Sequence, residues 1–189
     1  MTTRFDVYAV GNALVDLEYR VDDTFLQSQN IEKGVMTLAE ADMQARLLSA
    51  LDNQHTREKQ ASGGSAANSI IAASAFGSRC FYSCKVASDS LGDFYRKDLI
   101  AAGVSTNLQE QRPEGVSGTC VVMVTPDSER TMNTYLGITA DVSVSELDLD
   151  ALRASRWLYI EGYLSTSESA RAAVALARTE ARAAGVKLA

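Results

Sequence analysis

The sequence has only three cysteines and a single histidine in 189 residues. Cys80, Cys84 and Cys120 are odd in number and form no CxxC pair, and the first two fall within or beside an apolar run. This pattern is typical of reduced, buried thiols rather than of disulfides or a zinc site. His55 lies in a polar stretch, where we expect a solvated loop residue. The sequence therefore predicts neither a metal cluster nor a Ser-His-Asp or Cys-His catalytic arrangement.

Clustered positive charge and long apolar runs are also missing. The net charge is -6, and no cluster of Lys and Arg is present that could hold a nucleic-acid backbone. No window approaches a membrane span, and the N-terminus enters a strand-like run without a basic and apolar leader. With 46% hydrophobic and 22% charged residues, the composition is typical of a soluble globular protein, and we expect it in the cytoplasm.

Two familiar phosphate-binding loops are absent from the sequence. There is no Gly-x-x-x-x-Gly-Lys-Ser/Thr and no Gly-x-Gly-x-x-Gly, so neither ATP nor NAD has a recognisable loop here. A dehydrogenase of the doubly wound type is therefore disfavoured.

What the sequence does contain is a glycine pair that runs into a helix of small residues. Gly63 and Gly64 precede Ser65, and the helix predicted from Ser65 ends near Gly77. Glycine allows backbone amides to approach a ligand, and a helix start supplies free N–H groups and partial positive charge. The junction suits a polar or anionic ligand. An ordinary helix start with a Ser N-cap would look the same.

The hydrophobic pattern predicts strands that alternate with helices after residue 60. Strand-like runs cover residues 5–10, 80–86 and 157–160, and amphipathic or Ala-rich helices cover 91–102 and 167–184. This alternation predicts an α/β fold with a mostly parallel sheet flanked by helices.

Other segments need a separate layer. Residues 14–21 alternate like a half-exposed strand, and residues 116–125 and 130–136 read as strands joined by a turn at 126–129. Between them, Thr37 can cap a helix with Glu40 in capping-box register, and residues 52–60 are polar and turn-like.

Several separate segments agree with one family. They are Gly11-Asn12-Ala13-Leu14-Val15-Asp16, Gly63-Gly64-Ser65-Ala66-Ala67-Asn68, residues 86–94, Ser117-Gly118-Thr119-Cys120 and residues 129–133. In this order and spacing the chain resembles the ribokinase-like (PfkB) carbohydrate and nucleoside kinases, and within them the bacterial adenosine kinases. The resemblance implies one ribokinase-like α/β domain over residues 1–189, with a small β lid inserted at approximately 14–37, 54–62 and 105–137.

One departure from the family is large. Its catalytic aspartate lies in a Gly-Ala-Gly-Asp anion hole in the C-terminal half, and no such motif occurs between Met1 and Ala189. The sequence stops just after Gly185, which reads as a helix C-cap followed by the opening of a strand. We therefore expect an N-terminal portion of a kinase, inactive by itself.

Polar residues that follow strands are the first candidates for a site, because ligands of open α/β sheets gather at the carboxyl ends of the strands. These candidates are Asn12, Asp16, Gly64, Asn68, Asp89 and Glu161. Asp16 could accept hydrogen bonds from two neighbouring sugar hydroxyls, or could be an exposed strand-edge aspartate. The resemblance implies that Asp16 binds the sugar diol and that Asn12, Gly63, Gly64 and Asn68 complete the sugar pocket, although Asn68 could instead cap locally or face solvent. Glu161 matches a position that touches substrate in some of these sugar kinases, and an ordinary strand-end carboxylate is the alternative.

The resemblance also implies a role for Arg130, in the lid hairpin, where it could stabilise the transferred phosphoryl group. A surface residue paired with Glu129 or Asp127 is the plain alternative. The expected activity of the complete protein is phosphorylation of the primary, 5′-type hydroxyl of an adenosine-like nucleoside with ATP and Mg²⁺. A plain sugar kinase and a noncatalytic sugar- or nucleoside-binding module are the alternatives, and a homodimer through the β lid is left open.

Overall fold

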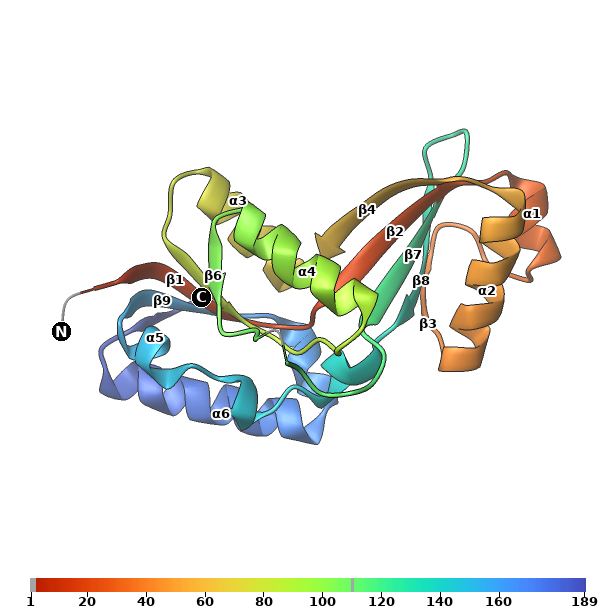
Figure 1. The fold of residues 1–189 in the computed structure, drawn as a ribbon. Helices are drawn as coiled ribbons and strands as arrows, with labels where there is room; N and C mark the ends of the chain where they lie inside the picture. The colour runs from red at the N-terminus through yellow and green to blue at the C-terminus, as the bar shows by residue number, and fades with distance from the viewer. Residues whose placement is uncertain (1–2, 110) are drawn as a thin grey trace.

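The structure is a computed structural model that describes residues 3–109 and 111–189. Within these residues the strands form two five-stranded sheets, which we call sheet A and sheet B. Sheet A and its helices make up one lobe, and sheet B with two further helices makes up the other (Figure 1).

Sheet A is parallel throughout and has the strand order β10-β9-β1-β5-β6. Its strands are β1 (Phe5–Val10), β5 (Cys80–Ser83), β6 (Val104–Thr106), β9 (Ser155–Ile160) and β10 (Lys187–Leu188). β1 lies in the centre, and the apolar sequence of β1 suits a strand with neighbours on both sides and helices on both faces. The predicted mostly parallel sheet is confirmed.

Helices cover both faces of sheet A (Figure 1). α3 (Ser65–Ala75) and α4 (Ser90–Ala101) pack on one face, and α5 (Leu149–Arg153) and α6 (Glu168–Ala183) pack on the other. The buried face of α6 is a row of alanines at helical spacing, Ala170, Ala173, Ala177 and Ala181. α3 likewise buries Ala66 and Ala67, so small side chains let both helices approach the sheet closely.

Sheet B is mixed, with the order β3-β8-β7-β2-β4. Its strands are β2 (Leu14–Arg20), β3 (Met36–Leu38), β4 (Arg57–Gly63), β7 (Gly118–Val124) and β8 (Arg130–Tyr135). α1 (Asp23–Ser28) and α2 (Ala41–Gln54) lie beside this sheet, and their buried side chains join Val15, Leu17, Val121 and Met123 in one core. Short 3-10 helices cover Gly137–Asp141, Val144–Glu146 and Gly162–Thr166.

The local predictions were wrong between residues 37 and 60. Thr37 lies in β3, and the helix begins at Ala41 after Glu40. Residues 52–60 are not a turn, because Leu47 and Leu51 anchor α2 through Gln54 and a polar edge strand, β4, starts at Arg57. His55 is half-buried, with its ring edge-on to Phe25 at 4.8 Å between centroids.

The hairpin and the cysteines agree with the sequence. β7 and β8 pair antiparallel across the turn at residues 126–129. Cys80, Cys84 and Cys120 are free and buried. None of the helices in the described part of the chain is long and apolar enough to cross a membrane.

Candidate functional site

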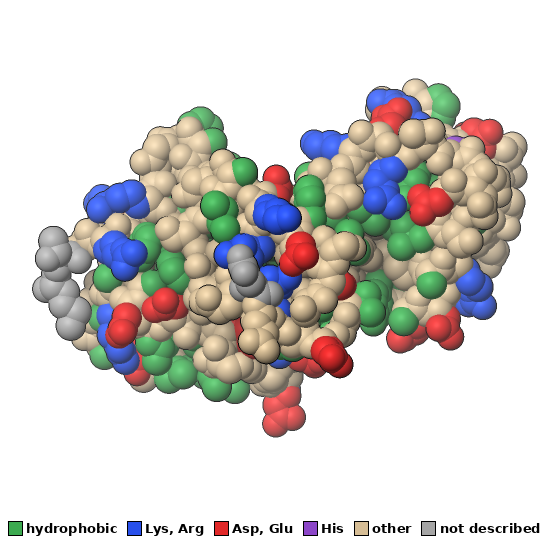
Figure 2. All heavy atoms as spheres, viewed as in Figure 1, with side chains coloured by type: hydrophobic (Ala, Val, Ile, Leu, Met, Phe, Trp, Pro, Cys, Tyr) green, Lys and Arg blue, Asp and Glu red, His purple; other side chains and the backbone are tan. Residues whose placement is uncertain are grey.

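The candidate site lies where the chain passes between the two sheets. Residues 11–13 carry it from β1 to β2, and Gly63 with Gly64 carries it from β4 back to α3. We call these segments crossing one and crossing two. They touch: a Cβ placed on Gly64 would lie 2.4 Å from the Asn12 carbonyl oxygen, and Gly64 has a φ of 98°. Figure 2 shows a hollow in the surface between the two lobes.

Asp16 lies against the backbone of crossing two. A Cβ placed on Gly63 would come within 2.2 Å of Asp16 Oδ1, so only glycine leaves room for the carboxylate. β2 and β4 pair directly here, with Leu14 opposite Gly63. Burial raises the pKa of Asp16 above its ordinary value, and the charges of Arg130 and Lys59 act in the opposite direction. The carboxylate is therefore held partly away from water, beside the glycine pair.

Arg130 is exposed on β8, and its positive charge reaches Asp16. Its suggested partner Asp127 forms an ion pair with Lys33 instead, at 2.7 Å. Asp16, on β2, and Arg130, on β8, thus belong to the same electrostatic neighbourhood, although β7 separates their strands. The role of Arg130 toward a phosphoryl group stays a prediction.

Glu161 occupies the start of α3. Its Oε2 accepts hydrogen bonds from Ser65 Oγ at 2.6 Å and from the Ala66 N–H at 3.0 Å, and its Oε1 accepts one from the Asn12 N–H. The residue is buried, with 4% of its surface exposed. A carboxylate at a helix N-terminus is a favourable cap. Glu161 therefore joins β9, crossing one and α3, and its contact with substrate stays a prediction.

Asn68 and Asp89 have contrasting surroundings. The Asn68 side chain is exposed on the first turns of α3, and its backbone N–H bonds to the Gly64 carbonyl at 2.9 Å. Asp89 caps α4, accepting from the Gly92 N–H at 2.7 Å, and also accepts from the Ser117 N–H at 2.8 Å. The structure thus brings Asn12, Asp16, Gly63 and Gly64 together with Asn68 nearby along the helix, whereas Asp89 anchors the segment that leads into β7.

Tyr163, which motif reasoning did not select, lines a cavity beside the α3 start. The cavity has a volume of about 360 Å³ and is lined by Ser65, Glu161 and Tyr163, among others. Tyr163 is 59% exposed, in the short helix directly after β9. An aromatic residue two positions after a strand-end carboxylate is the signal that could have identified it.

One face of sheet B combines polar and apolar side chains. The strand register places Ala61, Asp16, Cys120, Thr134 and Leu38 in one row across the five strands. The Thr134 hydroxyl lies 3.4 Å from Cys120 Sγ, as expected for neighbours on one face. The adjacent row on the same face contains Val122, Met132 and Met36. Leu38 is 60% exposed and Met36 45% exposed, so this face offers an apolar surface at one end and Asp16 at the other.

The described residues do not fit a nucleotide triphosphate or its metal. Within residues 3–109 and 111–189, no group of three or more His, Cys, Asp or Glu side chains could hold a metal ion. The start of α3 already carries the Glu161 carboxylate, which would repel a phosphate. We therefore derive no step through ATP or Mg²⁺ from these residues.

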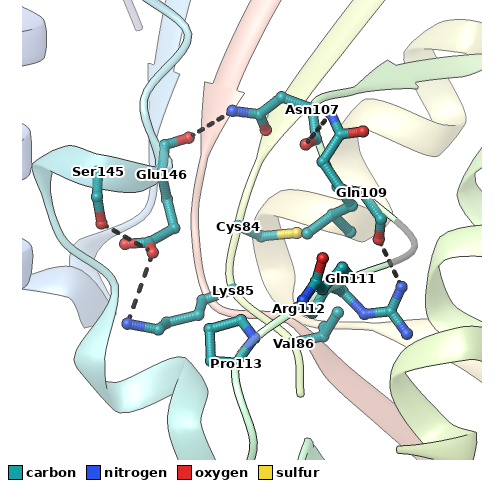
Figure 3. Close-up of a pocket in the computed structure, with 11 residues that line it drawn as sticks. Cys84, Lys85, Val86, Asn107, Gln109, Gln111, Arg112, Pro113, Ser145 and Glu146 are labelled. Carbon is teal, nitrogen blue, oxygen red and sulfur yellow. Dashed lines mark hydrogen bonds and ion pairs between the residues drawn. The ribbon is translucent and has the colours of Figure 1, made fainter. Parts of the chain in front are cut away.

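A second, smaller cavity of about 150 Å³ follows β5 and β6 (Figure 3). Its charged side chains are engaged with the protein: Lys85 lies 3.5 Å from Glu146, and Arg112 donates to the carbonyls of Gln109 and Ala87 at 2.6 and 3.0 Å. This cavity shares no lining residue with the Asp16 site.

Comparisons with known proteins agree on one family. A model of the pfkB family carbohydrate kinases matches residues 33–188. Adenosine kinase 2 from Arabidopsis thaliana is 28% identical over 166 residues, which cover 83% of this chain and 46% of that protein.

Solved structures share the fold. A probable sugar kinase from Rhizobium etli CFN 42 superposes with a TM-score of 0.85 at 34% identity, covering 99% of this chain and 56% of that one. The adenosine kinase from Sinorhizobium meliloti gives a TM-score of 0.84 at 36% identity, covering 98% of this chain and 55% of that one. The chain spans about half the length of these relatives, and its sheet A, helices and sheet B form the ribokinase-like fold. The chain belongs to the pfkB family of carbohydrate kinases.

Proposed function

We propose that the complete kinase transfers a phosphoryl group from ATP to the primary, 5′-type hydroxyl of an adenosine-like nucleoside, and that this segment supplies the substrate pocket and the lid. Family membership and the two relatives named as adenosine kinases support this class of reaction. The observation that carries the nucleoside assignment is the shared face of sheet B, which has Asp16 at one end and exposed Leu38 and Met36 at the other.

The sugar end is assigned to Asp16. A carboxylate accepts hydrogen bonds from two neighbouring hydroxyls, and such charge-assisted bonds are stronger than neutral ones. Gly63 leaves the carboxylate room to lie against the backbone, and Gly64 brings crossing one within contact. A ribose diol fits these features, because both hydroxyls can be held while the ring rests against the glycine pair.

The base end is assigned to the apolar part of the same face. β8 lies two strands from β2, which is about 10 Å at the usual strand spacing. This distance suits a nucleoside, whose base would then lie over Met132 with Leu38 and Met36 beyond it. A plain sugar bound at Asp16 would leave these side chains in water. Covering them stabilises the complex by the hydrophobic effect.

Arg130 is assigned to the transferred phosphoryl group. Its charge already reaches Asp16, so sheet B carries both the carboxylate proposed to bind the sugar and an exposed cation. A guanidinium can form paired hydrogen bonds to phosphoryl oxygens as negative charge spreads over them. The general base, the anion hole and the nucleotide site are assigned to residues outside this chain.

Ligand binding and turnover test the proposal separately. The full-length gene product is screened by thermal shift with adenosine, inosine, guanosine, ribose and fructose, because a ligand of the folded state raises the melting temperature. We expect the largest shift with adenosine. 5′-Deoxyadenosine is the matched control: it keeps the diol and the base but lacks the phosphate acceptor. It should raise the melting temperature and yield no ATP-dependent product.

Other outcomes select the alternatives. Shifts with ribose or fructose but none with a nucleoside would replace the proposal with a plain sugar kinase, a class named for the Rhizobium etli relative. Adenosine binding without phosphorylation under any ATP and Mg²⁺ condition would identify a noncatalytic binding module. The homodimer through sheet B stays a prediction, checked by light scattering of the purified protein.

A further inference from the structure

Two buried tyrosines form hydrogen bonds to the backbone of the two crossings. The Tyr82 hydroxyl, on β5, donates to the Asn12 carbonyl at 2.9 Å, and the Tyr95 hydroxyl, on α4, donates to the Gly63 carbonyl at 3.0 Å. Both side chains are fully buried. Each hydroxyl therefore holds one backbone carbonyl of its crossing.

The two tyrosines act on segments that contact each other. The Asn12 carbonyl oxygen, which accepts from Tyr82, is also the atom that a Cβ on Gly64 would strike. Burial raises the pKa of both phenols well above the ordinary value, and each phenol affects the other. Both hydroxyls consequently stay protonated and remain donors at any physiological pH.

α4 makes a second bond directly before crossing two. One turn after Tyr95, the Asp98 carboxylate accepts from the Ser62 N–H at 2.9 Å. Ser62 and Gly63 are the last residues of β4, an edge strand of sheet B. Helix α4, which belongs to the sheet A lobe, thus fixes successive backbone groups exactly where β4 enters the site.

We infer that Tyr82 and Tyr95 are positioning residues, which set the spacing between crossing one and crossing two and so hold Asp16 and the Gly63–Gly64 pair in sugar-binding geometry. The spacing of the two crossings is a property of the protein alone, whereas the sugar-binding role of that spacing rests on the proposed function. Neither tyrosine touches substrate. Removing a hydroxyl takes one hydrogen bond away from a buried carbonyl at the junction, which lets the crossing shift.

The test compares Tyr82→Phe and Tyr95→Phe with a matched control, Tyr8→Phe. Tyr8 is also fully buried on sheet A, and its hydroxyl is bonded to Ser83 Oγ at 2.7 Å and accepts from the Asp148 N–H at 3.1 Å, two residues that lie outside the crossings themselves. All three variants lose one buried, hydrogen-bonded hydroxyl. If the tyrosines had only a general structural role, hydrogen exchange and the KM for the nucleoside would change equally in all three variants.

The first readout needs no ligand. Amide hydrogen exchange is measured across residues 12–14 and 62–68 in the full-length protein. We expect it to become at least about tenfold faster in Tyr82→Phe and Tyr95→Phe, and unchanged in Tyr8→Phe, because local opening grows where an anchor is removed. Equal exchange in all three variants would overturn the inference, whatever the protein binds.

The second readout is kinetic. The KM for the nucleoside should rise about tenfold in Tyr82→Phe and Tyr95→Phe, with the KM for ATP unchanged. In the double variant the KM for the nucleoside should rise by less than the product of the two single effects, because the two residues act on segments that touch. Faster exchange in a protein that binds no nucleoside would refute the proposed function and leave the positioning intact. Faster exchange with an unchanged nucleoside KM would refute the sugar-binding part of the inference.

Discussion

Sheet A and sheet B each have five strands in the described part of the chain, but they differ in how far their faces are exposed to water. Helices cover both faces of sheet A, whose central strand β1 buries Tyr8, Ala9 and Val10 completely. Sheet B has α1 and α2 against one face, and its other face carries the half-buried Asp16 and the exposed Leu38. Sheet A is thus buried on both faces, whereas sheet B leaves one face partly open to water.

This difference has an energetic consequence. An aspartate whose pKa is raised by burial makes the folded state less stable at neutral pH, and a leucine that stays 60% exposed gains little from folding. Both features are expected where a ligand supplies the missing interactions. Changes on the open face of sheet B should therefore affect binding more than stability, whereas changes where the sheets join should affect stability.

The largest expected effect is at the junction. Gly64→Ala would place a Cβ 2.4 Å from the Asn12 carbonyl oxygen, a backbone atom, at a φ of 98°. We expect a loss of about 3 kcal/mol in the free energy of unfolding from strain and overpacking together. Gly77→Ala is the matched control, with a φ of 90° and no atom within 4 Å. It should lose about 1 kcal/mol in urea denaturation. Equal losses would show that the contact with Asn12 does not constrain the crossing.

Asp16→Asn should separate binding from stability. We expect adenosine affinity to fall at least about 100-fold, because two charge-assisted hydrogen bonds are lost. The free energy of unfolding at pH 7 should stay the same or rise. The folded pKa is raised, so the stabilising contribution belongs to the protonated form and is lost as the pH rises through that pKa. The neutral amide avoids this loss.

The same substitution predicts a pH profile. In the unsubstituted protein, adenosine affinity measured by calorimetry should fall as the pH drops through the raised pKa of Asp16, at a pH above the ordinary value of 3.8. In Asp16→Asn this acid limb should disappear. Asp42→Asn, an exposed change on α2, controls for net charge and should keep the limb. An acid limb that survives in Asp16→Asn would assign the titration to another group.

The parallel lobe could be predicted from the sequence because its signals are local. Each signal indicates a single element and the surface against which it packs. These signals are the small residues after Gly64, the alanines of α6 and the apolar sequence of β1. The local pattern does not reveal β4, because an edge strand with exposed charged residues carries no apolar alternation, and only the family resemblance places residues 54–62 in a β lid. Its partner β2 lies about forty residues earlier, so the pairing is set by tertiary contacts.

Only part of the candidate site could be predicted from the sequence, for the same reason. Asp16 and the glycine pair could be selected by motif, but no local pattern shows that Glu161 caps α3 or that Tyr82 and Tyr95 reach the crossings. These bonds join residues 32 to 95 positions apart in the chain. They arise from how β5, α4 and β9 pack around the junction, which the sequence specifies only through the whole fold.

The smallest expected effect tests the apolar end of the open face. Leu38→Ala removes a side chain that is 60% exposed, so the free energy of unfolding should change little. Adenosine affinity should fall about fivefold, corresponding to about 1 kcal/mol of lost apolar contact, and any binding of ribose should be unchanged. Ile100→Ala, 51% exposed on α4, is the matched control and should alter neither affinity. If Leu38→Ala weakened ribose and adenosine equally, the base would not lie on this face, and the contrast between the two sheets would rest on Asp16 alone.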